Sequence, residues 1–180
     1  MTVASLPITW KQTWFTISGI DGFTLPGMIE EPGCTAGSDG DRHHYGLPGR
    51  QQEYLESLGK FGKPIILVVT AGSPVDLSWA QEHCDAVLFA WYPGEQGGPA
   101  VADVVFGDYN PAGRLPLTFP KSYEQLPAFE NYNMAGRTYR FSAAEPLYRF
   151  GYGLSYTRFK YSKLTVRGYQ VSVKVKNVGK

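Results

Sequence analysis

Two short apolar runs constrain the fold of this chain more than any other feature. PIILVVT covers residues 64–70 and AVLFA covers residues 86–90, and neither run alternates with polar residues. A strand without polar alternation is buried on both faces, which is typical of a parallel sheet covered by helices. The stretch between the runs, GSPVDLSWAQEHC, predicts a loop and a short helix. We therefore expect an α/β domain with a mostly parallel sheet sandwiched by helices.

The segments around these runs continue the same alternation of strand and helix. Residues 48–62 place apolar side chains at helical spacing, and Gly62 is a suitable helix end. Residues 97–107 predict another helix with a valine-rich face. Residues 13–20 and 115–120 carry short clusters of strand-forming residues. We expect a strand in each of these two segments.

Composition and charge exclude several classes of protein. The chain has 180 residues, of which 43% are hydrophobic and 18% charged, so it is globular rather than disordered. Its net charge of +1 gives no electrostatic basis for binding nucleic acid or an anionic membrane. The sequence has no run of eighteen apolar residues, so no membrane-spanning helix is expected. The first twenty residues lack the pattern of a signal peptide, a basic region followed by an apolar one.

The C-terminal third of the chain changes character. Residues 123–162 are rich in tyrosine and phenylalanine with little periodicity, which predicts an extended connector packed by aromatic side chains. Residues 169–178 alternate valines with serine and lysines, the pattern of a half-buried strand. One strand cannot form a sheet, so we expect it to be the first strand of a β-domain that lies outside this chain.

A pair of glutamates is the first candidate for chemistry. Glu30 and Glu31 follow Met28 and Ile29 in the glycine- and proline-rich stretch MIEEPG. A carboxyl group beside apolar side chains can have a raised pKa and act as a general acid. The alternative is a pair of solvated glutamates in a loop.

A second cluster of polar residues lies in SDGDRHHYG. It contains Asp41, Arg42, His43 and His44, and imidazole and carboxylate groups bind zinc or manganese. The alternative is a turn with a local Asp–Arg pair and two exposed histidines. Because the spacing fits no established ligand pattern, no metal or other cofactor is predicted. Cys84 is expected to be a free buried thiol.

The residues that follow the two apolar runs are candidates for ligand contact. Ligands of open α/β sheets bind outside the carboxyl ends of the strands, which here are TAGSP and WYPGEQGG. Trp91 and Tyr92 could stack on a sugar there, or pack beneath the next helix. The sequence contains neither a G-x-S-x-G nucleophile elbow nor a phosphate-loop lysine in its glycine-rich GYGLSY stretch.

Several stretches together resemble glycoside hydrolase family 3, the β-glucosidase and β-xylosidase group. They occur in the order found in that family and cover about residues 38–165: GDRHHYGLPGRQQEYLESL, GKPIILVVTAGSPVDLSWA, AVLFAWYPGEQGGPAVADVVFGDYNPAGRLPLTFPKS, LPAF, GRTYRF and PLYRFGYGLSYTRFKYSKL. So long an ordered match is specific for the family but not for the substrate.

The resemblance implies a layout of domains. Members of the family carry an N-terminal (β/α) barrel, an α/β sandwich domain and often a fibronectin type III-like domain. The expected divisions are 1–37, a divergent segment with the acid/base loop; 38–122, the sandwich domain; 123–162, the aromatic connector; and 163–180, the first strand of a truncated fibronectin type III-like domain. Residues 90–122 are then scaffold that shapes the edge facing the barrel.

The resemblance also implies chemistry. The family hydrolyses β-glycosides with retention, using two carboxyl groups about 5–5.5 Å apart. The aspartate nucleophile comes from the barrel, which nothing in this chain resembles. The acid/base is a glutamate from a loop upstream of the GDR motif, so Glu30 is the first candidate and Glu31 the second. Asp41 and Arg42 match the Asp-Arg pair of the family and are expected to order this loop, and Trp91 is a candidate substrate contact.

Three functions follow from these patterns. The chain is part of an exo-acting β-glycosidase for β-linked oligosaccharides or aryl glycosides, inactive without its barrel partner. Alternatively, it is a non-catalytic carbohydrate-binding or docking module, as the tyrosine-rich connector and Trp91 indicate. Thirdly, it is an inert product of a broken reading frame that self-associates. The sequence does not decide between glucoside and xyloside as the preferred substrate. It also leaves the localisation open, although members of the family are often periplasmic or secreted.

Overall fold

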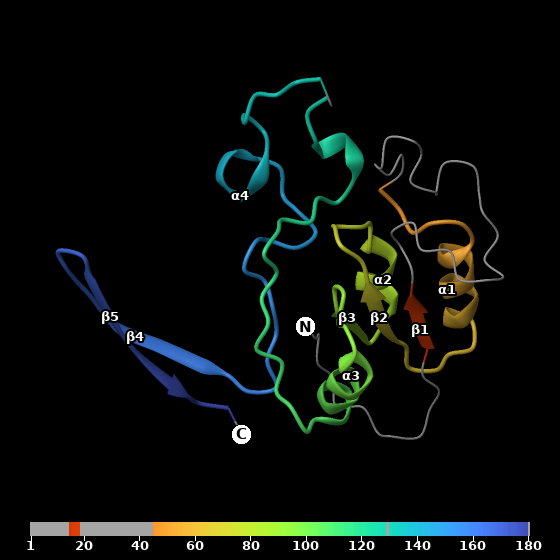
Figure 1. The fold of residues 1–180 in the computed structure, drawn as a ribbon, viewed down its shortest axis with the longest axis horizontal. Helices are drawn as coiled ribbons and strands as arrows, with labels where there is room; N and C mark the ends of the chain where they lie inside the picture. The colour runs from red at the N-terminus through yellow and green to blue at the C-terminus, as the bar shows by residue number, and fades with distance from the viewer. Residues whose placement is uncertain (1–14, 19–44, 129, 180) are drawn as a thin grey trace.

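The computed structural model describes residues 15–18, 45–128 and 130–179 (Figure 1). Three strands, β1 (Phe15–Ser18), β2 (Ile66–Thr70) and β3 (Ala86–Phe89), and three helices, α1 (Gln51–Gly59), α2 (Ser78–His83) and α3 (Gly97–Phe106), form the first part of the described chain. A 3-10 turn η1 (Tyr123–Gln125), a short helix α4 (Thr138–Phe141) and two strands, β4 (Phe159–Arg167) and β5 (Gln170–Asn177), follow. Among the described residues no helix is long and apolar enough to cross a bilayer.

The first three strands form a parallel sheet in the order β1-β2-β3. Phe15 lies opposite Leu67 in the β1–β2 pair, and Ile66 lies opposite Ala86 in the β2–β3 pair. The two apolar runs therefore form strands and pair in parallel, as their patterns predict. The strand expected within residues 13–20 also forms, as β1.

The two faces of this sheet have separate cores, because successive side chains of a strand point to opposite faces. Leu67 and Val69 pack with helices α1 and α2 on one face. Ile66 and Val68 pack with Val104 of α3 on the other face. The unbroken apolar character of β2 is thus explained by burial on both sides.

Helix α3 ends where its sequence predicts. Gly107 is its C-terminal cap, with a φ of 85° in the left-handed region that glycine adopts without penalty. Its backbone N–H donates to the carbonyl oxygen of Val104 at 3.2 Å. The helix expected within residues 48–62 is shorter than its pattern, since α1 ends at Gly59.

The strand expected at 115–120 does not form. Phe119 makes a single bridge to Tyr148, and the backbone N–H of Leu115 donates to the carbonyl oxygen of Tyr152 at 2.8 Å. Pro116 and Pro120 have no N–H to donate, so a regular ladder cannot be completed. The segment instead forms an irregular ribbon with residues 147–152. Fully buried Phe119 packs edge-to-face on Phe89, with 5.2 Å between ring centroids, and so belongs to the core on the α1 and α2 face.

Strands β4 and β5 form an antiparallel hairpin, which extends away from the parallel sheet (Figure 1). The sequence analysis expected only one strand here, but its partner is the segment Phe159–Arg167, at the end of the expected connector. Gly168, with a φ of 59°, begins the two-residue turn, as in type II′ hairpins. A β-bulge interrupts the ladder between Ser162 and Thr165, where Lys163 has a φ of 54°.

The hairpin has one apolar and one cationic face, and both are exposed. Val171, Val173 and Val175 share a face with Tyr161, and all four are exposed, so the expected half-burial of this strand is wrong for the described residues. Residues 157–179 contain no acidic side chain. Their basic side chains are Arg158, Lys160, Lys163, Arg167, Lys174 and Lys176.

Hydrogen bonds anchor the root of the hairpin to the end of α3. The phenolic O–H of Tyr156 donates to the carbonyl oxygen of Val104 at 2.5 Å. The side chain of Asn110 accepts from the backbone N–H of Tyr156 at 2.8 Å and donates to the hydroxyl of Ser155 at 3.0 Å. Gly153 approaches so closely that an added Cβ would lie 2.5 Å from the carbonyl oxygen of Gly113.

Candidate functional site

The carboxyl ends of the parallel strands form one edge of the sheet, where ligands of such folds bind. Strand β2 ends at Thr70 and strand β3 at Phe89. The backbone N–H of Ala90 donates to the carbonyl oxygen of Val69 at 2.8 Å, so the pairing continues one residue beyond β3. The loops that follow these two strands are therefore held next to each other, and we call them the carboxyl edge (residues 71–78 and 90–97).

Trp91 occupies an unusual backbone conformation on this edge. Its φ of 57° lies in the left-handed region, which costs a non-glycine residue about 1–3 kcal/mol. Its ring packs edge-to-face on Phe89, with 4.6 Å between ring centroids, and joins the core on the α1 and α2 face. The packing beneath α3, which the sequence analysis weighed for this residue, is therefore not what the structure has.

The glycines after Trp91 shape a tight turn into α3. Gly94 has a φ of 66°, and the N–H of Gly97 donates to its carbonyl oxygen at 3.1 Å. A Cβ added to Gly97 would lie only 2.7 Å from the ring of Pro93. The turn thus needs glycine both for conformation and for space, and it leaves the side chain of Tyr92 exposed.

The loop between β2 and α2 forms the other half of the carboxyl edge. Its apolar residues Ala71 and Val75 are fully buried and fix its path. The carboxylate of Asp76 accepts from the N–H of Ser78 at 2.9 Å, an Asx turn that starts α2. The N–H of Asp76 donates to the carbonyl oxygen of Tyr45 at 2.9 Å, and this bond fastens Tyr45 to the edge.

Tyr45 connects this edge to a distant part of the chain. Its phenolic O–H donates to the carbonyl oxygen of Pro120 at 2.8 Å. The hydroxyl of Ser78 donates to the carbonyl oxygen of Lys121 at 3.5 Å. The sequence analysis missed Tyr45 and Ser78, because their partners lie 75 and 43 positions away along the chain and come close only on folding.

Two groups with raised pKa values lie beside the sheet, the half-buried thiol of Cys84 and the buried phenol of Tyr148. Burial, with the Asp85 carboxylate adding to it, raises the pKa of the Cys84 thiol to about 11. Burial also raises the pKa of Tyr148, whose phenolic O–H donates to Gln81. Cys84 is a free thiol, as predicted, but it is half-buried rather than buried. A small cavity beside Tyr148 is lined mainly by Leu77, Val87, Phe89, Leu115 and Phe119, and its apolar lining indicates packing rather than catalysis.

Four of the five residues predicted for the site lie outside the described residues. They are Glu30, Glu31, Asp41 and Arg42, and His43 and His44 lie outside as well. Trp91 is described, and it lies on the carboxyl edge. Within residues 15–18, 45–128 and 130–179, no group of three His, Cys, Asp or Glu side chains is arranged to hold a metal ion.

Comparison with known proteins identifies the class to which this α/β unit belongs. The glycosyl hydrolase family 3 C-terminal domain matches residues 25–156. The chain is 48% identical over 188 aligned positions to a xylan 1,4-beta-xylosidase of Xylanibacter ruminicola, a match covering 97% of this chain and 22% of that protein. It is 41% identical over 159 positions to a beta-xylosidase of Formosa agariphila, covering 81% of this chain and 22% of that protein.

A solved structure agrees with these relatives. The crystal structure of a beta-glucosidase from Kluyveromyces marxianus superposes with a TM-score of 0.68 at 35% identity, over 78% of this chain and 19% of that one. The chain belongs to glycoside hydrolase family 3, and it carries the C-terminal domain of that family. It spans about a fifth of the length of the relatives it matches.

Proposed function

We propose that this chain is the C-terminal part of a retaining, exo-acting β-glycosidase that hydrolyses β-xylosides or β-glucosides. The family membership carries this proposal, together with the names of the relatives, which are xylosidases and a glucosidase. In this arrangement the parallel sheet is the centre of an α/β sandwich whose carboxyl edge faces an N-terminal barrel. The barrel supplies the aspartate nucleophile, so the chain alone does not hydrolyse glycosides.

The path of the chain supports Glu30 as the general acid/base, with Glu31 as the second candidate. Strand β1 runs parallel to β2 and ends at Ser18, at the carboxyl edge, and Tyr45 is bonded to the same edge. Ser18 and Tyr45, the described residues on either side of the stretch with both glutamates, therefore both lie at this edge. Asp41 and Arg42 order the acid/base loop in this proposal.

The remaining parts receive supporting roles in the same proposal. The Trp91 turn borders the sugar, because the strained conformation of Trp91 holds the exposed Tyr92 at the carboxyl edge. The β4–β5 hairpin is the start of a fibronectin type III-like sandwich, whose further strands would cover its exposed valines.

The test is a chimera in which this chain replaces the matching fifth of the Xylanibacter ruminicola relative. We expect the chimera to hydrolyse nitrophenyl β-xyloside or β-glucoside, and the chain alone to be inactive. Glu30→Gln should lower kcat about 10²–10⁴-fold. The loss in kcat/KM should be smallest for a dinitrophenyl glycoside, because a good leaving group needs no protonation in the step that forms the glycosyl-enzyme.

Glu31→Gln is the matched control, and it should change kcat little. If Glu31→Gln shows the large, leaving-group-dependent loss instead, the roles of the two glutamates are exchanged. A folded chimera without any turnover, or turnover by the isolated chain, would contradict the proposal.

A second candidate function is a non-catalytic carbohydrate-binding module. The exposed tyrosines between residues 123 and 139 favour it, since a tyrosine ring offers a sugar a flat apolar face and a polar hydroxyl. Titration of the chain with cello- and xylo-oligosaccharides, followed by tryptophan fluorescence, tests contact at Trp91. Absence of a saturable response up to millimolar sugar removes binding at that tryptophan.

A further inference from the structure

Residues 121–128 and 130–145 leave the carboxyl edge and return to it, and we call them the Arg137 loop. A single side chain closes its base: Gln125 accepts from the N–H of Lys121 at 2.7 Å and donates to the carbonyl oxygen of Glu145 at 3.2 Å. The excursion starts beside Pro120, where Tyr45 binds. In Figure 1, η1 and α4 lie beyond the ends toward which β1 and β2 point. The loop therefore continues the candidate site outward.

The guanidinium of half-buried Arg137 is bonded to backbone carbonyl oxygens rather than to a carboxylate. Its guanidinium donates to the carbonyl oxygens of Asn131 at 2.6 Å, Ala128 at 3.2 Å and Asn133 at 3.3 Å. Its neighbour Thr138 has a φ of 58°. One planar, charged group thus gathers three carbonyls of the loop and fixes its shape without an apolar core.

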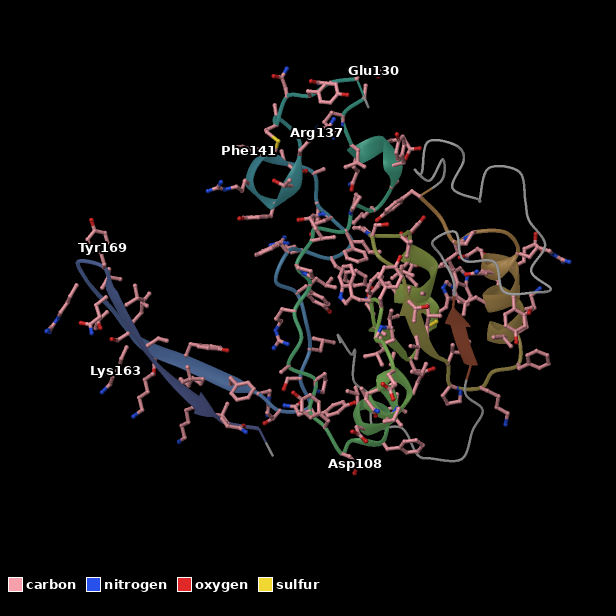
Figure 2. All side chains as sticks on the ribbon, in the orientation of Figure 1. Asp108, Glu130, Arg137, Phe141, Lys163 and Tyr169 are labelled. Atoms are coloured by element: carbon pink, nitrogen blue, oxygen red, sulfur yellow. The ribbon has the colours of Figure 1, made fainter. Side chains whose placement is uncertain are left out.

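Aromatic side chains and one methionine of this loop are exposed. Tyr132 is 86% exposed, Tyr139 58% and Met134 51%, and the ring of Tyr139 stacks on Phe150 with 4.4 Å between centroids. Figure 2 shows Glu130, Arg137 and Phe141 on this excursion, at the far end of the molecule from Asp108. Polar side chains lie among the rings, because Glu130, Asn131 and Asn133 belong to the same stretch.

This mixture matches the chemistry of a sugar ring. A pyranose presents an apolar C–H face, which stacks on aromatic rings, and a rim of hydroxyls, which bond to amide and carboxylate groups. A fixed loop loses little conformational freedom on binding, so its exposed rings are ready to receive such a ligand.

We propose that the Arg137 loop binds the sugar rings of a β-linked oligosaccharide that lie beyond the bond cut at the carboxyl edge. The inference rests on the proposed function for the class of substrate. Tyr132 and Tyr139 provide the stacking surfaces, and Arg137 is a positioning residue that sets their spacing. The loop then selects for chain length rather than for the sugar in the cleavage site.

The test is a ¹⁵N NMR titration of the 180-residue chain with xylotetraose and cellotetraose, with α-linked maltotetraose for comparison. We expect saturable shifts of the amides of residues 130–141 with a β-linked sugar and none with maltotetraose. Tyr132→Ala and Tyr139→Ala should each weaken binding about fivefold, the loss expected for one stacked ring. Arg137→Lys should weaken binding too, because an ammonium cannot span three carbonyls, while the chain stays folded.

Tyr109→Ala is the matched control, since Tyr109 is 57% exposed, close to the 58% of Tyr139, but it is the neighbour of Asp108, which Figure 2 shows far from the Arg137 loop. It should leave binding unchanged. Absence of saturable shifts with either β-linked sugar overturns the proposal, and so do shifts centred on Trp91 that survive Tyr132→Ala. Both results leave the chimera assay of the proposed function unaffected, so the two proposals fail separately.

Discussion

The phenolic oxygen of Tyr148 lies 2.5 Å from Oε1 of Gln81, a bond between residues 67 positions apart. It joins the irregular ribbon to helix α2, and Tyr148 is buried. Tyr148→Phe would leave the Gln81 oxygen without its donor while keeping the ring. Because Gln81 is exposed and its oxygen can bond to water, we expect a loss of about 0.5–1.5 kcal/mol in the free energy of unfolding, measured by urea denaturation. Tyr152→Phe, which alters the neighbouring stacked ring and keeps the bond, is the control and should cost less.

Alkaline pH should destabilise this fold in two steps. Burial and the Asp85 carboxylate raise the pKa of Cys84 from 9.0 to about 11, so the unfolded chain releases this proton at lower pH than the folded chain. Stability from this group is complete below pH 9 and is lost as pH rises towards 11. Burial raises the pKa of Tyr148 in the same direction from 10.0, so a second loss begins there.

Urea denaturation between pH 8 and pH 11 measures the alkaline loss. Cys84→Ala should flatten the decline between pH 9 and pH 11, and Tyr148→Phe the decline above pH 10. An unchanged slope in Cys84→Ala would show that the thiol does not contribute.

Two adjacent glycines should respond to alanine in opposite ways. A Cβ on Gly97 would lie 2.7 Å from Pro93, whereas a Cβ on Gly98 meets nothing within 4 Å. Gly97→Ala should therefore cost about 1–3 kcal/mol of stability. Gly98→Ala should gain about 0.5–1 kcal/mol, because alanine is the better helix former in α3. Thermal denaturation of both variants checks the pair, and equal effects would rule out the crowding at Pro93.

At position 91 a glycine variant should be more stable than an alanine variant, the reverse of the usual order. Both Trp91→Ala and Trp91→Gly lose the contact with Phe89, but only glycine accepts a φ of 57° without strain. We expect Trp91→Gly to be more stable than Trp91→Ala by about 1 kcal/mol. Chemical denaturation of the two variants measures the difference, and a more stable alanine variant would mean that the backbone is not strained.

The exposed hairpin should make the isolated chain self-associate through its valine face. Replacing Val171, Val173 and Val175 by threonine keeps the β-branched shape and should lower the association seen by light scattering. Added salt should raise association of the original chain, because it screens repulsion between the cations of the opposite face. Lys174→Gln, on that face, is the control and should not lower it. A chain that is monomeric at high concentration would contradict this prediction.

The parts of the fold that follow from local pattern could be predicted from the sequence. Strands β2 and β3 form where apolar runs are buried on both faces, and α3 stops at Gly107 because glycine accepts its φ of 85°. The segment 115–120 could not be assigned correctly, since its prolines prevent a ladder although its side chains suit a strand.

The hairpin and the site depended on information that periodicity lacks. Alternation along Phe159–Arg167 is broken by the bulge near Lys163, which hid the partner of β5. Trp91 was found because it follows a buried strand. Backbone carbonyl oxygens that folding brings close are the partners of Tyr45, Gln125 and Arg137. Every residue type has a carbonyl group, so the sequence does not indicate which residues will accept these bonds. The roles of Glu30, Glu31, Asp41 and Arg42 stay predictions.

Helix α3 has consequences beyond its packing on the sheet. It begins at Gly97, against the turn that holds Trp91, and it ends where Val104 accepts the hydrogen bond of Tyr156. Helix α3 has ten residues and is about 15 Å long, and it thus connects the carboxyl edge to the root of the β4–β5 hairpin. An interaction that fixes the position of the hairpin will therefore also restrict motion of the carboxyl edge at the other end of the helix.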